Sequence, residues 1–136
     1  MSNLDGLKIL VVDDERFIRT TIRAVLRAVG HFDVAEADDG DVALAEVERF
    51  KPDIVLCDIA MPRMGGLRFV EMLRKSTEAA TRDTPVVILS GHNDHPTVIA
   101  ASKLRIDGYL IKPISPKQLG DQLRKIVSRR EAMPLA

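Results

Sequence analysis

The sequence predicts an α/β fold in which helices cover both faces of a parallel β-sheet. Five short apolar segments, rich in β-branched residues, alternate along the chain with five segments whose apolar residues recur at helical spacing. The connections between these segments are short, as in a doubly wound sheet built from strand-helix-strand units. No internal repeat suggests another architecture, and the residue pattern alone leaves the strand order open.

The expected strands end on polar residues or on chain breakers. They lie at 7–12, 32–37, 53–58, 85–89 and 108–111. The strand at 53–58 follows Pro52, ends on Asp58 and is followed by Met61–Gly66, a series of residues that interrupt strands. The strand at 32–37 alternates apolar with polar residues, so we expect it to be more exposed and near an edge of the sheet.

The expected helices have recognisable starts and ends. The first begins at Glu15 and is closed by Gly30, and the second begins at Asp39, which can cap it. The third covers about 67–77 and is followed by a surface loop that reaches Thr84; the fourth, with the weakest pattern, covers 94–104. The fifth starts at Ser115, where a Ser cap, a Pro and a Gln follow the pattern of a capping box, and it ends before a frayed tail at 131–136.

Length and composition favour one domain with a single core. The chain has 136 residues, of which 46% are hydrophobic, and we expect one domain over 1–136 with its core at about 7–130. Its 20 basic and 20 acidic side chains cancel, so the overall charge predicts neither direct nucleic-acid binding nor attraction to anionic lipid. Without an apolar run of roughly 20 residues or a signal-peptide pattern, we expect a cytoplasmic protein that does not insert into membranes. The single cysteine, Cys57, lies within an apolar strand and is expected to be inert.

Charged and hydroxyl side chains terminate four of the five expected strands. They are Asp13, Asp14, Asp58, Ser90 and Lys112. Because neighbouring strands lie about 4.8 Å apart, carboxylates at the same edge would repel each other, and a hard divalent cation such as Mg²⁺ resolves that repulsion. Lys112 can hold a phosphate oxygen and Ser90 can donate to one. Together these groups describe a site for a phosphoryl group carried on a carboxylate.

Four motifs carry a resemblance to a known family over nearly the whole chain. They are Val11–Glu15, Asp58–Pro62, Leu89–Gly91 and Tyr109–Pro113, in the order and at the spacing of that family. The chain thus resembles the receiver domain of the response regulators of two-component signal transduction, of the stand-alone type found in chemotaxis. The resemblance implies a five-stranded, flavodoxin-like sheet in the order 2-1-3-4-5.

The resemblance also implies which residues carry the chemistry. It places the phosphoacceptor on Asp58 and the Mg²⁺ ligands on Asp58, Asp14 and the backbone carbonyl of Ala60, with Asp13 acting through water. Lys112 matches the lysine that contacts the phosphoryl group, and the family favours a cis peptide bond before Pro113.

A switch residue pair and a set of partners follow from the same resemblance. Ser90 matches the switch hydroxyl and Tyr109 the aromatic residue that turns inward when that hydroxyl shifts. The expected function is a signalling switch that catalyses only its own phosphorylation and dephosphorylation. A histidine kinase or phosphotransfer protein would supply the phosphoryl group, and the face formed by 97–104, 108–111 and the last helix would control a further, unidentified protein.

Simpler interpretations remain open for several of these residues. Asp13 or Asp14 could cap the first helix, Ser90 could be an ordinary hydroxyl at a strand end, and Tyr109 could be a half-buried packing residue.

The chain also departs from the family pattern at two places. Gly65 stands where the family usually has Asp, which removes a helix cap and should loosen the loop beside the site. Ala60 and His92 occupy the positions that border the approach of hydrolytic water in relatives, so we expect this pair to set the lifetime of the phosphoryl group.

Three rival functions are compatible with the predicted fold. A receiver-like scaffold could bind partners without phosphorylation, although the complete set of acids and lysine argues against it. An aspartate-based phosphatase usually has a second acid two residues after the nucleophile, where this chain has Ala60. A flavin-binding protein would need a loop rich in Ser, Thr and Gly after the first strand, whereas Asp13–Glu15 would repel a phosphate unless a metal ion intervened.

Overall fold

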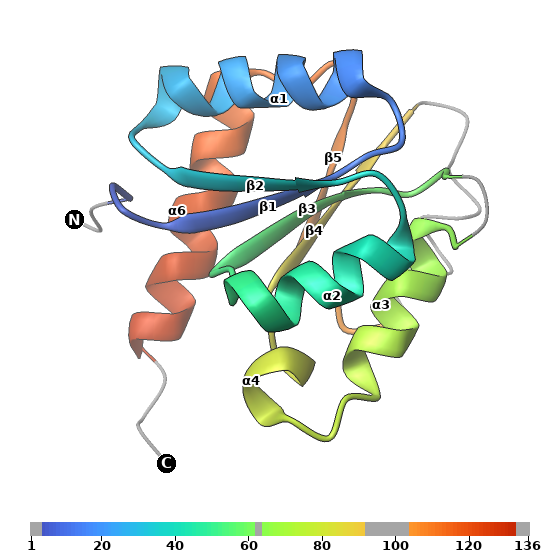
Figure 1. Cartoon of the computed structure of the whole chain (residues 1–136). Coiled ribbons are helices and arrows are strands. Elements are labelled where there is room, and N and C mark those ends of the chain that lie inside the picture. The colour runs from blue at the N-terminus through green and yellow to red at the C-terminus, as the bar shows by residue number, and fades with distance from the viewer. Residues whose placement is uncertain (1–3, 62–63, 92–103, 133–136) are drawn as a thin grey trace.

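A single parallel sheet forms the centre of the molecule. The computed structural model describes residues 4–61, 64–91 and 104–132, and its five strands follow the order β2-β1-β3-β4-β5 (Figure 1). The strands are β1 (Lys8–Val12), β2 (Asp33–Ala37), β3 (Ile54–Asp58), β4 (Val86–Ser90) and β5 (Gly108–Ile111). The predicted fold class and strand order are therefore confirmed, and β2 lies at an edge as its alternating sequence indicated.

Helices cover the sheet on both faces. Helices α1 (Arg16–Val29) and α6 (Pro116–Ala132) lie on one face, and α2 (Gly40–Phe50) and α3 (Gly66–Arg74) lie on the other (Figure 1). A short helix, α4 (Ala79–Arg82), lies between α3 and β4 in the chain.

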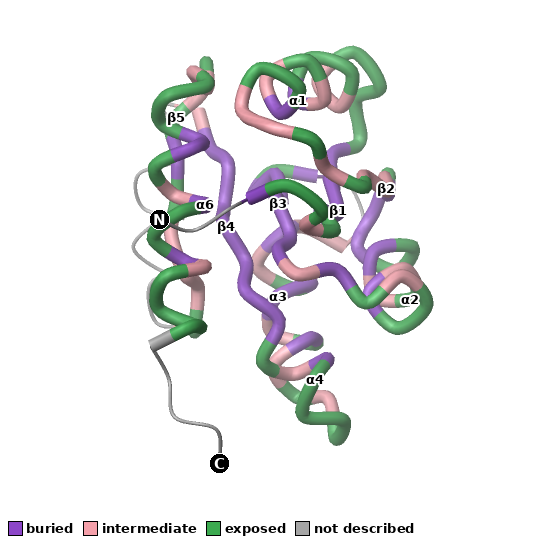
Figure 2. Tube along the Cα trace, turned by 90° about the vertical axis from the view of Figure 1, so that its left-hand side faces the viewer, coloured by how far each residue is buried: buried purple, intermediate pink, exposed green. Residues whose placement is uncertain are grey.

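Alternate residues of the central strands supply two separate hydrophobic clusters. In β3, Ile54 and Leu56 pack with residues of α1 and α6, whereas Val55 and Cys57 pack with residues of α2 and α3. Every residue of β3 and β4 is buried, while β2 is mostly half-buried or exposed (Figure 2). Strand β3 therefore holds its last residue, Asp58, on one of the most deeply packed elements of the fold.

Local side-chain bonds confirm the predicted helix starts. The Asp39 carboxylate accepts a hydrogen bond from the backbone N–H of Val42 at 2.8 Å. Ser115 Oγ accepts from the N–H of Gln118 at 3.1 Å, and the N–H of Ser115 donates to the Gln118 side chain at 3.4 Å. These bonds satisfy backbone donors that the first helical turn leaves without partners.

The surface loop expected before β4 contains a helix, and α3 ends earlier than predicted. Helix α3 stops at Arg74 rather than near Thr77, and α4 occupies part of the expected loop. The Arg74 guanidinium is the physical reason, because it donates to the backbone carbonyls of Arg82, Thr84 and Arg105, each at 2.7 Å. These contacts fold 75–84 back against the end of α3.

The last helix extends further than expected. Helix α6 runs to Ala132, so its final two residues lie where a frayed tail was predicted. Arg130 donates to the carbonyl of Asp53 at 3.2 Å and Arg129 to that of Asp107 at 3.4 Å, which ties the final turns to the sheet. The helix predicted over 94–104 lies, except for Leu104, outside the described residues.

Candidate functional site

The parallel register brings the ends of four strands to one edge of the sheet. Val12 of β1 pairs with Cys57 of β3, and Asp58 pairs with Leu89 of β4. Consequently Asp13 and Asp14, which follow β1, lie beside Asp58. Ser90 closes β4 and Lys112 follows β5 at the same edge.

Lys112 connects the acids across this edge. Its Nζ lies 3.0 Å from Oδ1 of Asp58 and 3.5 Å from Oδ2 of Asp13. Asp13 and Asp58 are only 1% and 6% exposed, so the lysine neutralises part of a buried negative charge. The peptide bond between Lys112 and Pro113 is cis, as the family resemblance implied.

Asp13 is held through both its main chain and its side chain. Its Oδ1 accepts from the N–H of Glu15 at 2.9 Å, and its own N–H donates to the Ala37 carbonyl at 3.1 Å. The cap position of α1 is occupied by Glu15, and no side-chain hydrogen bond caps this helix. Neither Asp13 nor Asp14 serves as the helix cap, so the simpler interpretation of these acids is wrong.

The three acids form a group that could hold a metal ion. One carboxylate oxygen from each of Asp13, Asp14 and Asp58 lies within 4.8 Å of the others. All the side-chain donors are hard oxygen atoms, which Mg²⁺ and Ca²⁺ prefer. Asp14 is the exposed member, so the group opens to solvent on its side.

Burial and charge shift the ionisation of the central pair. Burial raises the pKa of Asp58, and repulsion from Asp13 raises it more. Lys112 and a hydrogen bond from the Ala60 backbone lower this pKa, but their effect is smaller, so the pKa lies above its usual value. Burial alone would lower the pKa of Lys112, but its hydrogen bond and attraction to Asp58 raise that pKa overall. The lysine therefore stays protonated and can hold an anionic oxygen at the position of Asp58.

Ser90 and Tyr109 have very different surroundings. Ser90 is 1% exposed, and its Oγ has no hydrogen-bond partner among the described residues. A buried hydroxyl without a partner is uncommon and is available to a ligand oxygen. Tyr109, on β5, is 48% exposed, so the structure brings Ser90 to the site edge and leaves Tyr109 at the surface.

The turn after β3 depends on a glycine that the sequence patterns did not single out. A Cβ on Gly66 would overlap the carbonyl oxygen of Asp58 and lie 2.9 Å from Cα of Ile59. Gly65 caps α3 without a side-chain hydrogen bond, in line with the loss of the acidic cap expected there. The Gly-Gly pair was the available signal, because a close approach of two backbones selects glycine. His92, predicted to border the site, lies outside the described residues.

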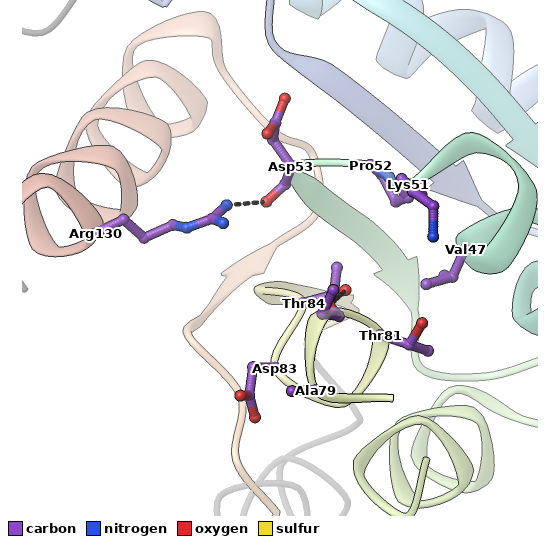
Figure 3. Close-up of a pocket in the computed structure, with 10 residues that line it drawn as sticks. Val47, Lys51, Pro52, Asp53, Ala79, Thr81, Asp83, Thr84 and Arg130 are labelled. Atoms are coloured by element: carbon purple, nitrogen blue, oxygen red, sulfur yellow. Dashed lines mark hydrogen bonds between the residues drawn. The ribbon is translucent and has the colours of Figure 1, made fainter. Parts of the chain in front are cut away.

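Two other features lie apart from this group. Cys57 is fully buried, which confirms its predicted place in the core, and burial raises the pKa of its thiol, as expected for an unreactive cysteine. A cavity of about 350 Å³ lies at the amino end of β3, beside Asp53 and Arg130 (Figure 3). Asp58 closes the opposite end of β3, so this cavity is not part of the acidic site.

Comparison with known protein families and curated proteins gives a consistent result. The family model described as the response regulator receiver domain matches residues 9–124. The phosphate regulon transcriptional regulatory protein PhoB of Klebsiella pneumoniae is 36% identical over 126 residues, which cover 93% of this chain and 54% of that protein. The probable transcriptional regulator ycf27 of Porphyridium aerugineum is 36% identical over 122 residues, covering 90% of this chain and 48% of that protein. The chain thus spans about half the length of these relatives.

Solved structures show the same fold at similar identity. A response regulator receiver domain protein from Clostridium thermocellum superposes with a TM-score of 0.82 at 29% identity, covering 92% of this chain and 97% of that one. The chemotaxis protein CheY4 of Vibrio cholerae gives a TM-score of 0.77 at 30% identity, covering 89% of this chain and 98% of that one. Within the described part of the chain, no helix is long and apolar enough to cross a membrane.

Proposed function

Because this chain belongs to the response regulator receiver domain family, we propose that it accepts a phosphoryl group on Asp58 from a histidine kinase or a phosphotransfer protein. One observation carries the proposal: Lys112 Nζ lies within 3.5 Å of both Asp58 and Asp13, where four strands end. In this proposal residues 1–136 form one receiver domain.

Mg²⁺ fits the donor set of the site. The three carboxylates crowd to within 4.8 Å, and one lysine offsets only part of their charge. Asp14, Asp58 and the backbone carbonyl of Ala60 would hold the ion, with Asp13 acting through a water molecule. When bound, Mg²⁺ neutralises the charge on the oxygens of the transferred phosphoryl group.

The residues of the chain have distinct roles in the transfer. An Oδ atom of Asp58 attacks the phosphorus, the bond between phosphorus and the donor imidazole nitrogen breaks, and its electron pair leaves with the imidazole. Lys112 donates to a phosphoryl oxygen, and the deeply packed strand β3 keeps the nucleophile in place.

Ser90 and Tyr109 would link phosphorylation of Asp58 to a conformational change at the protein surface. The Ser90 hydroxyl, without a partner among the described residues, would move to donate to the phosphoryl group. Tyr109, half-exposed on β5, would then turn inward. The face made by β5 and α6 would change as a result and control a partner protein. The segment 97–104, which the sequence predicts as part of the same face, lies outside the described residues except for Leu104.

The phosphoryl donor would approach over α1. An apolar hollow of about 330 Å³ lies between α1 and the segment after β5, and Lys112 itself lines it. Phe17 borders this hollow and is 77% exposed. A protein that delivers a phosphoryl group to Asp58 would therefore bury Phe17 as it reaches the site.

The direct test is phosphorylation by a small-molecule donor. Incubation with acetyl phosphate and Mg²⁺ should add the mass of one phosphoryl group to the intact protein, and Asp58→Asn should abolish the addition. A protein that stays unmodified would favour a receiver-like scaffold instead. Phosphotransfer profiling against candidate histidine kinases would identify the donor, and transfer that survives Asp58→Asn would overturn the assignment of the acceptor.

A further inference from the structure

Arg19 on α1 contacts the main chain of the acidic loop. Its side chain is 15% exposed, its Nε donates to Oε1 of Glu36 at 2.7 Å, and its Nη1 donates to the carbonyl oxygen of Asp13 at 2.7 Å. One guanidinium thus joins the edge strand β2 to the peptide between Asp13 and Asp14.

Glu36 fixes this guanidinium in place. Burial alone would raise the pKa of Glu36. Hydrogen bonds and attraction from Arg19 and Arg23 outweigh burial and lower this pKa overall, so the carboxylate is ionised at neutral pH. Arg23 donates to the other oxygen of Glu36 and to the carbonyl of Val34. The two arginines therefore share a partner and a helix, but only Arg19 reaches Asp13.

The position of the Asp13 carbonyl bears directly on Asp14. The carbonyl belongs to a planar peptide whose other half carries the N–H and Cα of Asp14. The Asp14 side chain is exposed and accepts no hydrogen bond from a described residue, whereas the Asp13 carboxylate is held by Glu15 and Lys112. The orientation of this one peptide therefore sets the direction in which Asp14 presents its carboxylate to the other two acids.

We propose that Arg19, held by Glu36, is a positioning residue for a divalent cation at the three acids. It acts through the Asp13 carbonyl and keeps the Asp14 carboxylate within reach of Asp13 and Asp58. The inference rests on the cation-binding part of the proposed function. It differs from a purely stabilising ion pair between α1 and β2, a role that Arg23 also fills.

Binding of Mn²⁺, followed by the electron paramagnetic resonance signal of the free ion, tests this difference. Loss of partners that orient metal ligands typically weakens metal affinity about 10-fold to 100-fold, and we expect a decrease at the lower end of this range for Arg19→Met. Arg23→Met is the matched control: it should lose comparable stability in urea but keep the affinity of the unchanged protein. If both variants bind Mn²⁺ equally well, or lose affinity equally, the proposal is overturned.

A second pair of variants and the unchanged protein serve as further controls for the Mn²⁺ measurement. If a methionine variant does not fold, Arg19→Lys and Arg23→Lys replace the pair, because a single ammonium cannot reproduce the fork that joins Glu36 to the Asp13 carbonyl. Arg19→Lys should again be the weaker Mn²⁺ binder. An unchanged protein that binds no Mn²⁺ would overturn the metal role of the three acids as well, whereas selective failure of the Arg19 comparison would leave that role intact.

Discussion

Asp58 is ionised at a cost to the folded state. Burial and the neighbouring Asp13 raise its pKa above the usual 3.8, so the folded protein binds this proton more tightly than the unfolded chain does. The contribution of Asp58 to the free energy of unfolding therefore falls as the pH rises from 3.8 through the pKa of Asp58 in the folded protein. The proposed function therefore requires a charged nucleophile at a position where burial disfavours charge.

Asp58→Asn should therefore stabilise the protein at neutral pH when divalent cations are absent. The free energy of unfolding in urea should exceed that of the unchanged protein at pH 7, and the difference should shrink as the pH approaches 3.8, where the unfolded Asp58 becomes protonated. Asp33→Asn, at an exposed position on β2, is the control. A variant that is less stable at pH 7, or a difference that does not change with pH, would contradict this account of Asp58.

Ala60 is expected to control how long the phosphoryl group persists. Its backbone N–H donates to the Asp58 carboxylate, and its side chain is exposed beside this proposed acceptor but offers water no polar anchor. Ala60→Asn adds an amide that can orient an attacking water molecule, so loss of the phosphoryl group should be several-fold faster. The decay of the phosphorylated mass after removal of acetyl phosphate measures this, and an unchanged decay rate would refute it.

The turn between β3 and α3 leaves no room for a side chain at Gly66. Gly66→Ala would drive a methyl group into the backbone of Asp58 and Ile59, which cannot rotate away as a side chain can. Overpacking of this kind costs about 1–3 kcal/mol, and we expect a loss of unfolding free energy in that range together with slower phosphorylation of Asp58.

The neighbouring glycine provides the control for this prediction. A Cβ on Gly65 would meet its nearest atoms at 3.6 Å, and its φ of −72° suits any residue. Gly65→Ala should therefore change the free energy of unfolding by less than about 1 kcal/mol, because the lower entropy of the unfolded chain offsets the poorer fit of Ala at an N-cap position. Equal losses in urea denaturation for the two variants would show that the close approach at Gly66 is unimportant.

The exposed N-terminal end of α1 should affect phosphotransfer from a protein donor but not phosphorylation by a small-molecule donor. Phe17 is 77% exposed beside the apolar hollow that Lys112 lines, and it makes no contribution to the buried clusters. Phe17→Ser should slow phosphotransfer from the cognate histidine kinase about 10-fold or more, since burying such a side chain contributes about 1.5–3 kcal/mol. Phosphorylation by acetyl phosphate should remain unchanged. Equal rates of kinase transfer for both proteins would remove α1 from the docking surface.

The elements that the sequence predicts correctly are those with local signals. The Asp39 and Ser115 caps act within three residues, and the apolar runs of the central strands are continuous, so their bounds differ from the structure by one residue at most. The acids at the site edge were also predictable, because a parallel sheet gathers the residues that end its strands.

Other elements depend on partners that are distant in the sequence. Arg74 holds the segment of α4 by donating to carbonyls at 82, 84 and 105 together, and no local pattern encodes that convergence. The contact of Arg19 with Glu36 and Asp13 likewise requires α1, β2 and the acidic loop to be packed together. In the sequence, Arg19 looks like part of a solvated helix face, because Arg16, Arg23 and Arg27 recur along the same helix.

At the scale of the whole molecule, the centre of the sheet is deeply buried while its β5 edge is partly exposed. Strands β3 and β4 are buried along their entire length between two helical layers, and they carry Asp58 and Ser90 (Figure 2). Strand β5 lies at the sheet edge, and its residues alternate between buried and exposed positions. A structural change started at Asp58 would therefore reach the surface through β5 rather than through the core.

Tyr109 allows that change to be observed directly, because the chain has one tyrosine and no tryptophan. Its ring is 48% exposed, so an inward rotation would alter its solvent contact and its fluorescence. Acetyl phosphate with Mg²⁺ should change the tyrosine emission in step with the gain in mass. In Ser90→Ala the mass should still increase while the emission stays constant, since the hydroxyl proposed to couple Asp58 to β5 is gone. An emission change that persists in Ser90→Ala would show that the signal reaches Tyr109 by another route.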